Sequence, residues 1–254
     1  MCGNSIRCRF DGSSIYNCMR AFAISCWLPN RSYERQTLSC IRSIRLAGHT
    51  EDIFVLTIDQ SLRDRIGERD WKVLSFPEIS YDGLHDMSPG KLLARSDAQK
   101  LYFWSLPEEY RKVFCMDCDV LVNRDCGDIF QRPVVSFLHW HNGGIPLLAG
   151  QFLYRPNNED FQDLMNLVKS GFNKELGWNN HGPFEWKGKI YPWDFQAAST
   201  AQGYLFYYFN FVKKNLSYYN FYSCVTHYAG KRHKFCKPES ELYTTNINRL
   251  IGCL

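Results

Sequence analysis

The first half of the chain alternates between short apolar runs and segments whose apolar residues recur every three or four positions. The runs predict buried strands, and the spaced segments predict helices. The first helix, for example, carries Leu38, Ile41 and Ile44 on one face and ends at Gly48. The predicted elements are strands over 21–27, 52–57, 71–76 and up to 117, and helices over 32–48, 62–67 and 91–106. This alternation predicts an α/β fold with a mainly parallel central sheet flanked by helices.

The second half has a less regular pattern. A strand is predicted over 151–154, followed by a helix that begins at Asn157 or Asn158 and ends at Gly171. The segment 172–190 reads as irregular, and its aromatic residues fit a binding wall or lid better than a core. The first 20 residues are predicted to form a loose segment, and residues 21–254 to form a single domain.

Composition narrows the class of protein. The chain has 254 residues, 45% of them hydrophobic, and a net charge of only +4, which gives no basis for nucleic-acid binding. The apolar stretch 21–28 is too short to span a bilayer, and no signal-peptide cleavage pattern follows it. The eleven cysteines form no repeating framework and several lie in apolar settings. A reducing compartment, and hence a cytoplasmic location, is expected.

Two carboxylates, Asp117 and Asp119, lie one residue apart between apolar segments at the end of a predicted strand. In an extended chain they point to the same side, and their oxygens suit a hard cation such as magnesium, manganese or calcium. Ligands of open α/β sheets bind at this carboxyl edge. From the spacing alone, a simple turn explains the pair equally well. Cys115 and Cys118 also have the spacing of a redox or zinc pair.

Several motifs then follow in a characteristic order. Lys100 to Leu106, Asp117-Cys118-Asp119 and Asp128-Ile129-Phe130 resemble the central block of the glycogenin-like members of glycosyltransferase family 8. Trp193-Asp194-Phe195-Gln196 resembles the family's Asp-Gln segment, and residues 226–231 resemble its His-x-x-Gly-x-x-Lys motif. The resemblance covers about residues 21–238. It implies a nucleotide-diphospho-sugar transferase (GT-A) fold, a UDP-sugar donor, Mn²⁺ with Mg²⁺ as the alternative, and transfer with retention.

The resemblance also implies roles for individual residues. Asp117, Asp119 and His227 would bind the metal ion, Asp194 would lie near the anomeric carbon, and Lys100 would reach the donor phosphate and sugar. Taken alone, His227 could be structural and Lys100 could be an exposed helix lysine. The donor-binding residues would be Ser25, Cys26, Tyr33, Lys100, Asp117, Cys118, Asp119, Gly150, Gln151, Gln196, Gly230, Lys231 and Lys234.

The chain departs from the family pattern at the sugar pocket. Leu148-Ala149-Gly150 stands where the family has Asn-Ser-Gly, Phe195 splits the Asp-Gln pair, and His233 replaces a lysine. The expected function is a metal-dependent retaining hexosyltransferase acting on a UDP-sugar and a hydroxyl acceptor on a glycan or protein. The alternative is a catalytically degraded nucleotide-sugar-binding or scaffolding protein of the same fold. The donor sugar, self-glycosylation on tyrosine and a homodimer stay open.

Overall fold

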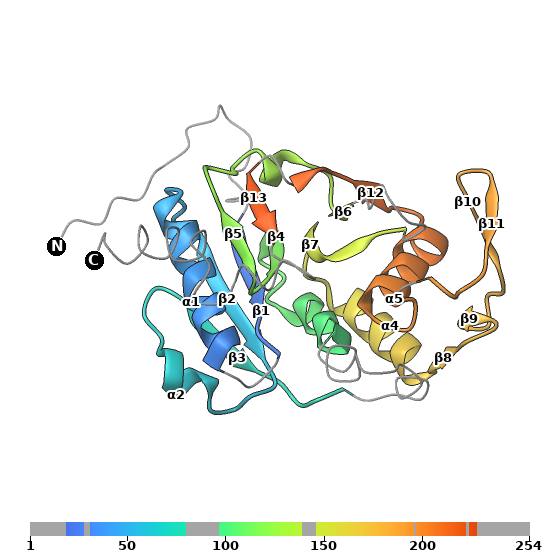
Figure 1. Cartoon of the computed structure of the whole chain (residues 1–254), viewed down its shortest axis with the longest axis horizontal. Coiled ribbons are helices and arrows are strands. Elements are labelled where there is room, and N and C mark those ends of the chain that lie inside the picture. The colour runs from blue at the N-terminus through green and yellow to red at the C-terminus, as the bar shows by residue number, and fades with distance from the viewer. Residues whose placement is uncertain are drawn as a thin grey trace.

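The centre of the molecule is a seven-stranded sheet in the order β12-β6-β7-β4-β1-β2-β3 (Figure 1). The computed structural model describes residues 19–27, 31–79, 97–138, 146–195, 197–221 and 224–227. β7 pairs antiparallel with both of its neighbours and every other pairing in this sheet is parallel, so the predicted mainly parallel sheet is confirmed. The strands are β1 (Met19–Ser25), β2 (Asp52–Thr57), β3 (Lys72–Ser75), β4 (Tyr110–Asp117), β6 (Ser136–Leu138), β7 (Leu148–Tyr154) and β12 (Ser217–Tyr218).

Alternating side chains of the sheet supply two hydrophobic cores. In β4, Val113 and Cys115 face one core, whereas Phe114 and Met116 face the other. The first core is covered by η2 (Gln99–Ser105), α4 (Asn158–Lys169) and α5 (Ala201–Tyr207). The second is covered by α1 (Arg31–Leu46), α2 (Leu62–Ile66), η3 (Ile129–Gln131) and the antiparallel pair β5 (Val120–Val122) and β13 (Val225–His227).

Helix ends lie where the sequence places them. The backbone at Gly48, just after α1, has φ +89°, a left-handed conformation that glycine adopts without strain. The side chain of Asn157 caps α4 by accepting a hydrogen bond from the Asp160 amide at 2.9 Å. Gly171, with φ +81°, follows the end of α4. Local capping chemistry therefore sets the length of both helices.

Two stretches differ from the sequence prediction. Within the predicted helix 91–106, the structure describes a 3₁₀ helix, η2, in which Leu101, Tyr102, Phe103 and Trp104 are all buried. Burial of consecutive side chains removes the one-sided pattern of a surface α-helix. The loose N-terminal segment was predicted to extend to residue 20, but Met19 and Arg20 already belong to β1; residues 1–18 lie outside the described part.

The segment 172–190, predicted to be irregular, forms two hairpins. Trp178 and Phe184 are almost completely buried, so the prediction of a binding wall is wrong for these two side chains. They pack against α5, which continues into the π-helical turn η4 (Tyr208–Val212). The hairpins are β8 (Phe172–Asn173) with β9 (Gly177–Trp178), and β10 (Phe184–Trp186) with β11 (Lys189–Tyr191). No helix in the described ranges combines the length and apolar character needed to cross a membrane.

Candidate active site

Ser25 and Asp117 are the last residues of two neighbouring parallel strands, β1 and β4, and they lie opposite each other in the register. The Ser25 hydroxyl donates a 2.7 Å hydrogen bond to Oδ1 of Asp117. Parallel strands end at one edge of a sheet, so their terminal polar side chains meet there. The structure thus brings together two of the residues that the sequence assigns to the donor site.

Lys100 contacts Asp117 of this pair and is almost completely buried. Its Nζ is 2.9 Å from Oδ1 of Asp117 and 2.7 Å from Oδ1 of Asp97, and it donates to the carbonyl of Ala149 at 3.0 Å. Burial alone would lower the pKa of Lys100, but the carboxylates of Asp117 and Asp97 outweigh it and raise that pKa above its ordinary value. The reading of Lys100 as an exposed helix lysine is therefore wrong.

Asp97 is a site residue that the sequence reasoning missed. Besides pairing with Lys100, its carboxylate accepts a hydrogen bond from the Thr200 hydroxyl at 3.1 Å. Asp97 thereby connects Lys100 to the segment that follows Asp194. The spacing of three residues between Asp97 and Lys100, which suits an ion pair within a helical turn, was the available signal.

The structure decides between the two arrangements of Asp117 and Asp119 that the sequence left open. β4 ends at Asp117, and Cys118 and Asp119 form a turn into β5, so the two aspartates do not share one extended strand. The chain turns here because β5 leaves the main sheet and pairs with β13. Both carboxylates nevertheless affect the same neighbour. The pKa of Tyr33 is raised to about 12, first by burial and then by nearby negative charges that include Asp119 and Asp117. Tyr33, one of the predicted donor-binding residues, lies beside the turn.

The cysteines near the turn are core residues. Cys115 belongs to one core cluster and Cys118 to the other, because they face opposite sides of the sheet. The Cys118 thiol donates a hydrogen bond to Oε1 of Gln36 at 3.7 Å. Its hydrogen bond with Cys26, together with burial, raises the pKa of Cys118 well above its usual range. A redox or zinc pair of Cys115 with Cys118 therefore lacks the required geometry.

Strand β13 brings the C-terminal motif to the same turn. His227 lies opposite Val120, the residue after Asp119, and Asn123 donates to the Thr226 hydroxyl at 2.6 Å. The backbone register therefore places the third predicted metal ligand next to the two aspartates. Its side chain, like Gln196, Gly230, Lys231 and Lys234, lies outside what the structure describes.

The remaining predicted residues are Asp194, Gly150 and Gln151. Asp194 is exposed in a turn after the buried Trp193, and no contact within the described residues joins it to Lys100. Gly150 and Gln151 lie on β7, where Gln151 is opposite Met116. Gln151 is fully buried, and in the described structure both polar atoms of its amide lack a hydrogen-bond partner.

The buried amide of Gln151 gives a stability prediction with a matched control. Replacing Gln151 by Met should raise the free energy of unfolding by about 1–3 kcal/mol, because an unsatisfied buried polar group is removed. Gln99 is equally buried, but its amide makes two hydrogen bonds with the backbone of Ile79, at 2.8 and 2.9 Å. Gln99→Met should lower the free energy of unfolding by a similar amount. Urea denaturation of both variants tests this, and equal destabilisation by the two would contradict it.

The carboxylates suit a divalent cation. A carboxylate has about four lone-pair positions, so Asp117 can accept from Ser25, pair with Lys100 and still coordinate an ion. Asp119 supplies a second hard-oxygen ligand at the same turn. Among the described side chains, no three His, Cys, Asp or Glu form a complete metal site. A third protein ligand for such an ion would come from outside these side chains, and the backbone position of His227 on β13 fits that role.

Comparisons with known proteins find relatives over part of the chain. No protein-family model matches the chain. Glycogenin-1 of Caenorhabditis elegans is 28% identical over 152 residues, covering 55% of this chain and 33% of that protein. A putative UDP-glucuronate:xylan alpha-glucuronosyltransferase of Arabidopsis thaliana is 24% identical over 159 residues, covering 61% of this chain and 24% of that protein. The matches thus span a third or less of each relative.

The fold has solved counterparts. The galactosyltransferase LgtC, crystallised with donor and acceptor sugar analogues, superposes with a TM-score of 0.53 at 13% identity, covering 92% of this chain and 95% of LgtC. The fold is therefore the predicted GT-A fold. The sequence relatives and the fold agree with the resemblance to the glycogenin-like members of glycosyltransferase family 8 that the motifs predict.

Proposed function

We propose that this chain is a metal-dependent retaining glycosyltransferase that moves a hexose or a related sugar from a UDP-sugar to a hydroxyl acceptor. The observation that carries the proposal is the cluster of Lys100, Asp117 and Ser25 at the carboxyl ends of β1 and β4. Open α/β sheets bind ligands at this edge. The name of the Arabidopsis relative specifies UDP-glucuronate, which supports a UDP-sugar donor.

Each residue has a distinct part in the proposed site. Asp117 and Asp119 would hold Mn²⁺ or Mg²⁺, with His227 as third ligand. Such an ion, when bound, neutralises the charge that develops on a departing diphosphate. Ser25 and Lys100 hold the Asp117 carboxylate in a fixed position, as a supporting shell does for a metal ligand.

Lys100 is proposed here as a positioning residue. Its amine is occupied by two carboxylates and one carbonyl, so its described contacts orient Asp117 and Asp97. Direct contact with the donor, which the family resemblance implies, stays a prediction. Asp194, exposed in its turn, is proposed as the group near the anomeric carbon.

The test is a panel of UDP-glucose, UDP-galactose, UDP-xylose, UDP-glucuronate and the N-acetylhexosamine donors, each with Mn²⁺ or with EDTA. We expect release of UDP and free sugar from at least one donor, detected by liquid chromatography, in the Mn²⁺ samples alone. Calorimetric binding of UDP without any hydrolysis would favour the degraded binding protein instead. The absence of both binding and hydrolysis with every donor would contradict both functions.

A further inference from the structure

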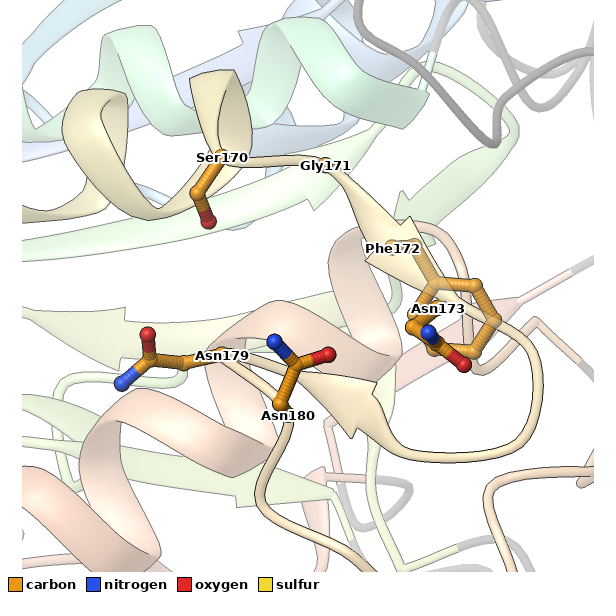
Figure 2. Close-up of a pocket in the computed structure, with 6 residues that line it drawn as sticks. All are labelled: Ser170, Gly171, Phe172, Asn173, Asn179 and Asn180. Atoms are coloured by element: carbon orange, nitrogen blue, oxygen red, sulfur yellow. The ribbon is translucent and has the colours of Figure 1, made fainter.

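A pocket of about 290 Å³ lies between the end of α4 and the hairpin of β8 and β9 (Figure 2). It is separate from the aspartate cluster, and no role in donor binding is assigned to it. Its volume lies just below the usual range for ligand sites, which is about 300–1,000 Å³. The pocket is lined by Ser170, Gly171, Phe172, Asn173, Asn179 and Asn180.

The lining has the chemistry of a site for a neutral, hydroxyl-rich ligand. It contains three amides and one hydroxyl, which offer both donors and acceptors, and none of its side chains is charged. The half-buried ring of Phe172 adds an apolar surface. A phosphate would call for cationic side chains and a metal ion for carboxylates. A sugar ring, with hydroxyls at its rim and C–H groups on its faces, matches all of these features.

The amides are oriented by the backbone. Asn179 and Asn180 both have φ 52°, in the left-handed region that Asn tolerates better than most residues. Figure 2 shows the Asn180 amide pointing toward the end of α4, whereas the Asn179 side chain extends sideways. Asn179 and Asn180 are both exposed, and Asn179 donates to the Tyr207 hydroxyl at 3.2 Å. Asn173 uses its Oδ1 for two backbone amides, at 2.9 Å each, which leaves its NH₂ group for a ligand.

The wall of the pocket is anchored to the core beside Asp194. Trp178, which precedes Asn179, is fully buried and donates to the Ala198 carbonyl at 2.7 Å. Gly177 packs directly on the ring of Trp193, where an added Cβ would lie only 2.3 Å from the ring atoms. Trp193 precedes Asp194 in the chain. The pocket and the proposed reaction-centre carboxylate therefore flank one rigid packing unit.

We propose that this pocket binds one sugar unit of a neutral oligosaccharide acceptor, away from the sugar that receives the transferred group. The acceptor role rests on the proposed transferase function, whereas sugar binding by the pocket does not. Binding energy from a remote unit of this kind positions a substrate for reaction. The acceptor is accordingly a glycan chain.

Saturation-transfer NMR on the full chain, without UDP-sugar or metal, tests the pocket directly. The probes are maltohexaose, cellohexaose and xylohexaose, and we expect saturation transfer to at least one of them. Asn180→Gly, which keeps the left-handed backbone unstrained, should raise the Kd for that probe about three- to tenfold through the loss of one or two neutral hydrogen bonds. Asn158→Ala is the control, because it removes an exposed amide at the opposite end of α4.

The outcomes separate the pocket from the transferase. Unchanged affinity in Asn180→Gly, or no saturation transfer to any of the three hexasaccharides, overturns the proposal. Weaker binding in Asn180→Gly with normal binding in Asn158→Ala supports it. If the same wild-type protein binds a hexasaccharide through Asn180 but hydrolyses no UDP-sugar, the sugar site stands and the proposed transferase function fails.

Discussion

Replacement of Asp117 by Asn is expected to reduce turnover of the UDP-sugar by about a hundredfold to a thousandfold, the cost of losing one group that stabilises transition-state charge. Asparagine keeps the shape of the side chain but has no negative charge to offer a metal ion. It also removes one of the two carboxylates around Lys100. Initial rates of UDP release at saturating Mn²⁺ measure the effect.

A control must show that lost turnover in Asp117→Asn comes from the missing carboxylate and not from misfolding. Asp64→Asn is the matched control, since Asp64 is an exposed aspartate in the first turn of α2. Mn²⁺ with UDP should raise the Tm of the wild type and of Asp64→Asn, because a ligand that binds only the folded state stabilises it. The same addition should leave the Tm of Asp117→Asn almost unchanged. Wild-type turnover in Asp117→Asn would refute the metal-anchor role.

Lys100→Met should lower the free energy of unfolding by about 2–4 kcal/mol. Methionine fills a similar volume, but Asp97 and Asp117 would then face each other without a cation, and the Ala149 carbonyl would lose its donor. Both carboxylates are about a quarter exposed, at 23% and 25%, and this keeps the cost below that of a fully buried pair. Lys174→Met, at an exposed position, should have little effect.

A double-mutant cycle identifies the source of the penalty. Asp97→Asn combined with Lys100→Met removes one of the two facing negative charges, so the double variant should be more stable than the sum of the single changes predicts. Strict additivity would show that the pair does not interact.

The pH dependence of the Lys100→Met penalty has a definite sign. The folded pKa of Lys100 is raised, so its stabilisation is complete below the unfolded value of about 10.4 and is lost only as the pH rises through the folded value. The lysine therefore contributes no change in the penalty across neutral pH. Urea denaturation at about pH 6 and about pH 8.5, both below that unfolded value, should give the same contribution from Lys100.

The strands and helix ends were predictable because they depend on local sequence. Buried runs such as β2 and caps such as Asn157 and Gly48 need only their near neighbours. The burial of Lys100 was not predictable, because its ion pair with Asp117 depends on how η2 packs beneath β4. The turn at Cys118 stayed one of two open arrangements, because it depends on the non-local pairing of β5 with β13.

Two further features of the fold could not be predicted from local sequence. α5 and η4 bury consecutive aromatic side chains, and the sequence then shows no helical period. The pairing of β5 with β13 joins residues about a hundred positions apart, such as Val120 and His227. In the sequence, only the family motif, in which a His follows the Asp-x-Asp, connects these two segments.

The reversed direction of β7 decides where polar residues must be sought along the chain. β1 and β4 bring their last residues, Ser25 and Asp117, to the ligand edge, whereas β7 brings its first ones, and the carbonyl of Ala149 holds Lys100 from there. A substitution at the first residues of β7 would therefore disturb the site as directly as one at the last residues of β4. In this fold the ligand edge is formed by the carboxyl ends of the parallel strands and by the amino end of β7.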